Sequence, residues 1–199
     1  FDWLTDQKKL HIEGAIEQNS RNSAVVKGDY IFKPKNDELS FNIKVDKLSI
    51  TPLERYLKGF ASKIVGLATG ELNLTGLAKA PNLTGKARLQ RASILIDYLN
   101  TRYSVLPEQD IVFDEKYIAF NNIGISDDQN HKGSVDGKIF HNHFSDFTFS
   151  LRVNANKLQC LNTNAFQNEL FYGKAFATGY AKIIGTLNLL KLDVVARSE

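Results

Sequence analysis

The 199-residue sequence contains no methionine and only one cysteine, Cys160. A single cysteine excludes a disulfide within the chain and leaves the redox compartment open. No apolar run approaches the roughly 18 residues of a membrane-spanning helix, and no signal peptide is present. Because even position 1 is not methionine, we expect the chain to be a piece of a longer protein, in which missing targeting signals carry no weight.

Concentrated charge is also missing. The net charge is only +3, and basic residues are spread through alternating segments, as at Lys86 and Arg88. A nucleic-acid-binding protein would gather them in one patch. Neither a glycine-rich phosphate loop nor a nucleophile elbow is found. The sequence therefore disfavours nucleic-acid binding and offers no catalytic motif of these two kinds.

The chain does contain a repeated sequence motif (the phrase below), in which a glycine precedes alternating apolar and polar residues. It occurs at residues 70–76 (GELNLTG), 85–91 (GKARLQR), 173–179 (GKAFATG) and again from residue 179 (GYAKIIGTLNL). Alternation places successive side chains on opposite faces of a strand. Glycine between such strands supplies turns and bulges. The phrase predicts a long β meander with one apolar face and one polar face.

The clearest predicted strand covers residues 146–154, where Phe147, Phe149, Leu151 and Val153 share one face. Further strands, with less regular alternation, are predicted at residues 12–16, 28–32, 39–45, 70–76, 86–90, 94–98, 111–113, 116–120, 123–125, 133–140, 175–183, 186–189 and 192–196. Groups of turn-forming residues at 35–37, 80–82, 121–122 and 127–130 separate some of these strands.

One helix is predicted over residues 51–65. Thr51 is a candidate N-cap, followed by Pro52 and by Glu54 as a capping box, and Gly66 is a plausible stop. We expect its apolar stripe either to plug the groove of the sheet or to form an ordinary surface helix. The stripe consists of Leu53, Leu57, Phe60 and Ile64.

Residues that could carry chemistry are few. His141 and His143 would point to one side of a strand near His131, but no cysteine or carboxylate stands at supporting spacing, so we expect no metal. Asp127 and Asp128 are adjacent and would diverge on an extended backbone, so we interpret them as turn residues rather than as a catalytic pair. We predict no enzyme activity and no cofactor.

Several stretches together resemble the AsmA/TamB superfamily. Residues 70–76 and 81–85 resemble its repeat, and the C-terminal region of TamB-like proteins is similar to residues 92–105, 123–127, 133–146, 161–163 and 171–181. The resemblance is dense from about residue 48 to residue 192. It implies an all-β fold, in which one long sheet curls into a taco-like open groove. Residues 1–199 would be a single segment of a longer protein of this kind.

The resemblance also implies a location and a role. TamB-like proteins are anchored in the inner membrane of diderm (Gram-negative) bacteria and cross the periplasm, and related groove proteins carry phospholipid between membranes. The family is also tied to outer-membrane assembly with a partner barrel of the BamA/TamA type. The family has no catalytic residues that could be assigned to positions in this sequence.

Our main hypothesis is a non-enzymatic lipid conduit, in which apolar inward side chains shelter acyl chains from water. One alternative is a scaffold or chaperone for outer-membrane proteins, acting by addition of a strand to an exposed sheet edge. Another is an extracellular β-solenoid binding or glycosidase domain, which the mostly Lys, Thr, Ser, Asn and Arg outer face disfavours. The predicted groove lining is Leu72, Leu74, Leu89, Ile94, Ile96, Ile118, Phe120, Phe147, Phe149, Leu151, Leu187 and Leu189, with Leu53, Leu57 and Phe60 as a possible plug.

Overall fold

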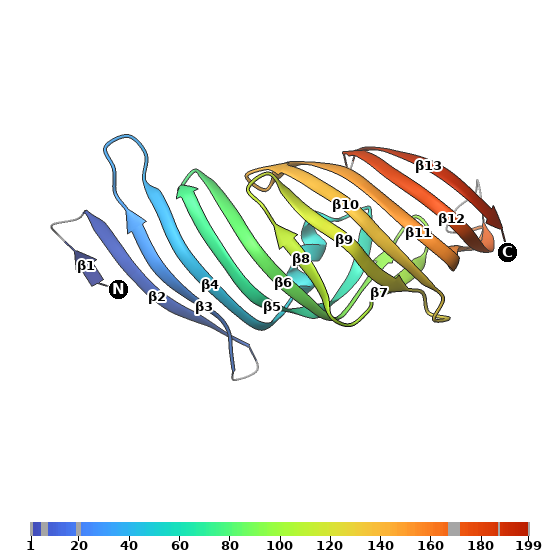
Figure 1. Ribbon diagram of the computed structural model, residues 1–199, viewed down its shortest axis with the longest axis horizontal. Helices are drawn as coiled ribbons and strands as arrows, with labels where there is room; N and C mark the ends of the chain where they lie inside the picture. The colour runs from blue at the N-terminus through green and yellow to red at the C-terminus, as the bar shows by residue number, and fades with distance from the viewer. Residues whose placement is uncertain (1, 5–7, 19–20, 167–171, 187, 199) are drawn as a thin grey trace.

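In the residues that it describes, the computed structural model contains one antiparallel sheet of 13 strands (Figure 1). It describes residues 2–4, 8–18, 21–166, 172–186 and 188–198. The strands are β1 (Asp2–Leu4), β2 (Lys9–Gln18), β3 (Arg21–Ile31), β4 (Glu38–Ser49), β5 (Ala61–Leu77), β6 (Ala80–Ile96), β7 (Thr101–Val105), β8 (Gln109–Phe113), β9 (Tyr117–Ser126), β10 (Lys132–Asn142), β11 (Ser145–Thr163), β12 (Gly173–Thr186) and β13 (Leu189–Ser198).

Strands that follow one another in the chain lie next to one another in the sheet. The exceptions are the two short strands β7 and β8, which both lie between β6 and β9. They lie end to end at the same position in the sheet, separated by residues 106–108. The sheet therefore advances along the long axis of the molecule, with the N-terminus at one end and the C-terminus at the other (Figure 1).

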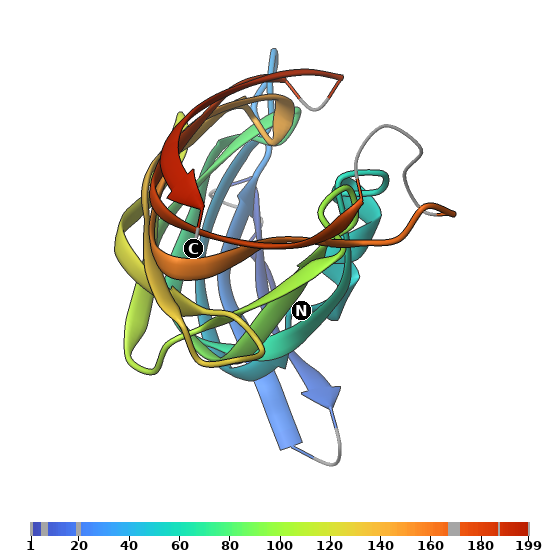
Figure 2. The same ribbon diagram turned by 90° about the vertical axis from the view of Figure 1, so that its right-hand side faces the viewer.

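The sheet is curled around its long axis (Figure 2). Apolar residues pair with apolar residues across neighbouring strands, as Phe41 does with Leu74 and Ile43 with Leu72. We call the side that carries these residues the inner face, and the opposite side the outer face. The all-β class and the curled sheet predicted from the sequence are confirmed.

Gly70, Gly76 and Gly85 lie inside long strands and not between short ones, so the boundaries predicted for the strands at residues 70–76 and 86–90 are wrong. The strands predicted at residues 133–140 and 175–183 already contain Gly137 and Gly179. Gly70 is in the middle of β5 and Gly137 in the middle of β10. A Cβ atom on Gly70 would lie 2.1 Å from the Lys86 carbonyl oxygen, and one on Gly137 would lie 2.2 Å from that of Ser150. Neighbouring strands approach so closely here that no side chain fits, which allows the sheet to curl.

Three further boundaries between strands and turns also differ from the prediction. Residues 80–82 begin β6, and residues 121–122 form a bulge inside β9, where Asn122 has a φ of 50°. The ends of the predicted strand at residues 186–189 belong to two strands, because β12 ends at Thr186 and β13 begins at Leu189. Asparagine and proline tolerate the first positions and bulges of a strand as well as turns, so the pattern does not separate these cases.

The predicted helix of residues 51–65 is wrong beyond its first turns. The structure has a 3₁₀ helix, η2 (Thr51–Tyr56), whose N-cap is Ile50 and has no side-chain cap. The Glu54 carboxylate does not close a capping box, because it accepts a hydrogen bond from the Ile64 main-chain N–H at 3.2 Å. Residues from Ala61 onward pair with β6, so sheet hydrogen bonds replace helical ones. Among the described residues, no helix has the length and apolar character of a membrane span.

The two halves of the sheet share the same bulge. In β4 the main-chain N–H of Lys47 donates to the Thr69 hydroxyl at 3.0 Å, and in β11 that of Lys157 donates to the Thr178 hydroxyl, also at 3.0 Å. Lys47 and Lys157 both have a φ of 53°. Each threonine stands in the sequence Ala-Thr-Gly on the next strand. Strands β3–β6 and β10–β13 are therefore two copies of one unit.

The register of the two units agrees with this equivalence. Gly28 pairs with Phe41 as Gly137 pairs with Leu151. The next strands match as well, because Gly70 pairs with Ala87 as Gly179 pairs with Ala196. In this comparison β13 takes the place that β6 has in the first unit.

Candidate functional site: the inner face of the sheet

The inner face is apolar across the whole first unit. Its in-register positions in β3–β6 carry no charged side chain. The larger of these side chains are half-buried, so they are covered by each other but still meet solvent. They include Val26, Tyr30, Leu39, Phe41, Ile43, Leu72, Leu74, Leu83 and Leu89. This part of the inner face is an open, uncharged surface.

The structure places ten of the twelve predicted groove residues on the inner face. They come from β5, β6, β9 and β11, and are Leu72, Leu74, Leu89, Ile94, Ile96, Ile118, Phe120, Phe147, Phe149 and Leu151. Leu189 pairs with Thr186 on the outer face and is 80% exposed, so it does not join them. Leu187 lies outside the described residues.

The segment that follows η2 packs onto the inner face of the second unit. The ring centroids of Phe60 and Phe149 are 6.1 Å apart, and Phe149 is only 3% exposed. Leu57 is half-buried, whereas Leu53 is exposed. Two of the three predicted plug residues therefore face the protein and one faces solvent. Ile64, the fourth member of the predicted stripe, is buried in β5.

The second half of β11 closes the curl at the same level. Figure 2 shows β11 and β12 running across the opening toward β7 and η2. The Asn162 N–H donates to the Leu99 carbonyl at 2.9 Å, and the Asn100 side-chain amide donates to the Asn162 carbonyl at 2.6 Å. The Tyr103 hydroxyl donates to the Gln159 carbonyl at 2.7 Å. These bonds tie β11 to the β6–β7 connection.

A packed core fills this closed section. Ile64 of β5, Ile123 of β9 and Leu158 of β11 are each less than 5% exposed. The sequence gives little sign of the closure, because it depends on bulges at residues 155–158 and 159–161 that redirect β11. The inner face is consequently open in the first unit and covered around Phe149 in the second.

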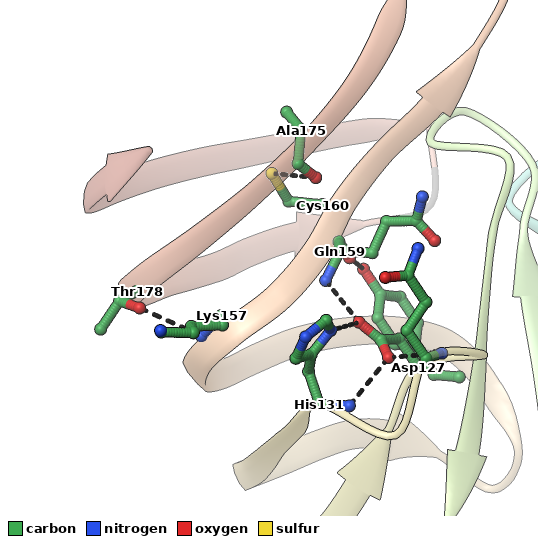
Figure 3. Close-up of polar contacts among 9 residues, drawn as sticks. Asp127, His131, Lys157, Gln159, Cys160, Ala175 and Thr178 are labelled. Atoms are coloured by element: carbon green, nitrogen blue, oxygen red, sulfur yellow. Dashed lines mark hydrogen bonds and ion pairs between the residues drawn. The ribbon is translucent and has the colours of Figure 1, made fainter. Parts of the chain in front are cut away.

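Asp127 holds the β9–β10 turn against β11 (Figure 3). One carboxylate oxygen accepts the main-chain N–H groups of Gln129 and His131, at 2.9 and 3.0 Å. The other accepts the Gln159 N–H at 2.8 Å and lies 3.0 Å from the His131 ring nitrogen Nδ1. Burial raises the pKa of Asp127, but these hydrogen bonds outweigh burial and the net pKa is lowered.

This arrangement assigns Asp127 a structural role. Its side chain has no exposed surface, whereas the neighbouring Asp128 is exposed, so the two carboxyl groups do not converge on one site. The sequence predicts the turn, but the long-range bond to Gln159 has no local signal.

The single cysteine follows Gln159 in β11. Burial raises the pKa of the Cys160 thiol, which donates to the Ala175 carbonyl at 3.4 Å (Figure 3).

The two neighbouring histidines do not face the same way. His141 is 8% exposed and stacks on Phe144 at 4.5 Å, whereas His143 is exposed and its Nδ1 lies 3.1 Å from the Pro81 carbonyl. The positive φ of His143 breaks the alternation that the sequence pattern assumes. Within the described part of the chain, no three potential ligands group into a metal site.

The outer face carries the charge. Arg88 pairs with Asp110 at 2.7 Å and with Glu108 at 2.6 Å. Lys138 lies over the Tyr117 ring and Arg152 over the Tyr180 ring, each 3.7 Å from the centroid. Polar and charged side chains of the outer face thus contact water, whereas the inner face can contact apolar molecules.

Comparison with known proteins identifies the second half of the sheet. Residues 121–198 match the family model described as the TamB C-terminal domain. No curated protein and no solved structure matches the chain. The TamB family belongs to the translocation and assembly module of the bacterial cell envelope, is non-enzymatic, and acts with the outer-membrane assembly machinery. The match identifies residues 121–198 as similar to the TamB C-terminal domain, and it supports a TamB-like protein whose C-terminal region includes them.

Proposed function

We propose that the inner face binds phospholipid acyl chains and guides lipid between the inner and outer membranes. The observation that carries this proposal is the half-buried apolar surface of β3–β6, which has no charged side chain at its in-register positions. An acyl chain that leaves water for such a surface gains about 0.8 kcal/mol per CH₂ group. Headgroups stay in solvent at the open seam, so no charge has to be buried.

The proposal includes a plug at the second unit. Phe60 covers Phe149, and β11 crosses the opening at the same level. Lipid therefore occupies the open first unit in this conformation, and the covered section stops it from passing further. Passage requires the Phe60 segment to move away from Phe149.

The cellular setting follows from the family and the groove together. We place the protein in the periplasm of a Gram-negative bacterium, with an inner-membrane anchor outside this sequence. Its partners are phospholipid acyl chains and an outer-membrane barrel of the BamA/TamA type. No step of this function needs an enzyme, a cofactor or a metal.

Photo-crosslinking tests the conduit directly. A benzophenone side chain at Leu74 should capture phospholipid in cells, and the same side chain at Asn73 should capture none, because adjacent strand positions face opposite ways. The two positions are adjacent in β5, and Asn73 pairs with Asn42 on the outer face. Equal capture at both positions, or capture at neither, would contradict the conduit.

A second candidate function, a scaffold that adds a strand from an outer-membrane protein, is favoured by the edge strand β13. Leu192, Val194 and Val195 of this strand are each more than 55% exposed. In the first unit the equivalent strand, β6, pairs on that side with β8. Binding of a purified BamA/TamA-type barrel should weaken at least tenfold in the double variant Leu192→Lys/Val194→Lys, and unchanged binding would reject this candidate.

A further inference from the structure

An open hollow of about 590 Å³ lies beside the plug, between η2 and the start of β5. Its lining includes Gly59 and Ala61, the two neighbours of Phe60. The Phe60 carbonyl accepts the main-chain N–H of Asp97, another lining residue, at 3.1 Å. The hollow is therefore continuous with the segment that packs on the inner face.

The charges that line this hollow are balanced. Arg55 and Lys58 supply two cations, and Glu54 and Asp97 supply two carboxylates. Arg55 is held by its neighbour, because its guanidinium lies 4.6 Å from the Tyr56 ring centroid and donates to the Tyr56 hydroxyl at 2.6 Å. The inner face nearby has no such charges at its in-register positions in β3–β6.

The two carboxylates accept hydrogen bonds from uncharged groups of β5. Glu54 accepts from the main-chain N–H of Ile64, and Asp97 accepts from the Ser62 hydroxyl. These bonds fix both acids in position without neutralising their charge. Because Arg55 is likewise held by an uncharged partner, the hollow presents both signs of charge to solvent.

We propose that this hollow binds the headgroup of a zwitterionic phospholipid. The phosphate is matched by Arg55 and Lys58, which present several N–H donors, and the ammonium is matched by Glu54 and Asp97. A purely anionic headgroup would meet the same cations but also two carboxylates, which repel it. This inference rests on the proposed lipid conduit and names the lipid class that the conduit prefers.

The test is lipid uptake from vesicles made of equal parts of phosphatidylethanolamine and phosphatidylglycerol. Lipid retained by the purified protein is identified by native mass spectrometry. We expect the parent protein to enrich phosphatidylethanolamine about fivefold, the scale of two exposed charge contacts. Glu54→Gln/Asp97→Asn should shift this enrichment toward phosphatidylglycerol while keeping both hydrogen-bond acceptors. The double variant Arg55→Gln/Lys58→Gln should retain less of both lipids, because both carry the phosphate that the two cations bind.

The matched control is Lys44→Gln/Lys86→Gln, which removes two exposed cations from the outer face. It should retain the enrichment of the parent. Lipid bound in the vesicle ratio by the parent, with no change in either hollow variant, would overturn the headgroup site and leave the conduit standing.

A soluble probe separates the two proposals if the parent retains no lipid. That result would reject the conduit, and equilibrium dialysis against labelled glycerophosphoethanolamine would then test the hollow without acyl chains. The headgroup site predicts at least threefold more bound probe for the parent than for Arg55→Gln/Lys58→Gln. Equal amounts would overturn it.

Discussion

The ring of Phe60 packs against the ring of Phe149, with centroids 6.1 Å apart and planes tilted by 38°. The two residues are far apart in sequence and belong to different repeats of the sheet. Their contact joins the segment after η2 to the inner face of β11. It is the point at which the open groove of the first unit meets the covered section of the second.

Phe60→Ala tests this contact. Because Phe60 is only half-buried, we expect a loss of about 1–2 kcal/mol in the free energy of unfolding, below the 3–5 kcal/mol typical of a fully buried phenylalanine. Urea titration measures the loss. The plug proposal further predicts more lipid capture by a photo-crosslinker at Leu151. Leu53→Ala is the control, since Leu53 is 50% exposed; equal effects of the two changes would contradict the packing role of Phe60.

Gly70→Ala tests the origin of the curl. The new Cβ would lie 2.1 Å from the Lys86 carbonyl oxygen, so β5 and β6 must separate, and we expect a loss of about 1–3 kcal/mol from overpacking. Gly14→Ala is the matched control in β2, because nothing lies within 4 Å of its Cβ position. Thermal unfolding compares the two variants. A Gly70 variant as stable as the Gly14 variant would show that close strand approach does not require glycine here.

Asp127→Asn tests the hydrogen bonds between the β9–β10 turn and β11. The amide keeps one acceptor but presents an NH₂ group to N–H donors, so we expect a loss of about 2 kcal/mol in unfolding free energy at pH 7. Asp128→Asn, a change at an exposed neighbour, should have little effect. Chemical denaturation measures the unfolding free energy of both variants. An equal loss in Asp127→Asn and Asp128→Asn would rule out a special role for Asp127.

The same residue predicts a pH dependence. The pKa of Asp127 is lowered in the folded state, so its contribution is complete above the unfolded pKa of about 3.9 and is lost as the pH falls through the folded pKa. Unfolding free energies of the parent should therefore decline below about pH 4, and those of Asp127→Asn should decline less. Parallel pH profiles for parent and variant would contradict this sign.

His141→Phe tests a buried histidine at the β10–β11 connection. Burial and the charge of His143 lower the pKa of His141, while Asp114 opposes them. The unfolded chain then binds a proton more readily, so stability should fall as the pH drops below about 6.5 toward the folded pKa. In the first unit Phe32 stands at the same distance after Gly28 as His141 after Gly137.

Phenylalanine should therefore fit this position. The Nε2 atom of His141 is buried without a partner among the described residues, and Nδ1 accepts only the Phe144 main-chain N–H at 3.4 Å, so the change removes one long hydrogen bond. We expect the unfolding free energy of His141→Phe to lie within about 1 kcal/mol of the parent value at pH 7 and to show a flatter profile between pH 6.5 and 5. A steeper profile, measured by thermal unfolding across that range, would contradict this assignment.

The sequence alone determined the class of fold and the two faces of the sheet. Strict alternation in residues 146–154 places Phe147, Phe149 and Leu151 on one side, and the structure has them there, because strand geometry reverses the face at each residue. The resemblance to TamB-like proteins was also visible in the sequence, and the family match over residues 121–198 confirms it for the stretches within that range.

Only the tertiary structure decided how these strands continue and where the groove is covered. Gly70 looks like a turn residue but lies inside β5, since its missing Cβ serves the approach of a neighbouring strand that is distant in sequence. Residues from Ala61 onward carry a helical pattern yet pair with β6, because sheet hydrogen bonds and burial outweigh local propensity. The contacts of Phe60 with Phe149 and of Asp127 with Gln159 depend on the curl of the whole sheet, which no local pattern encodes.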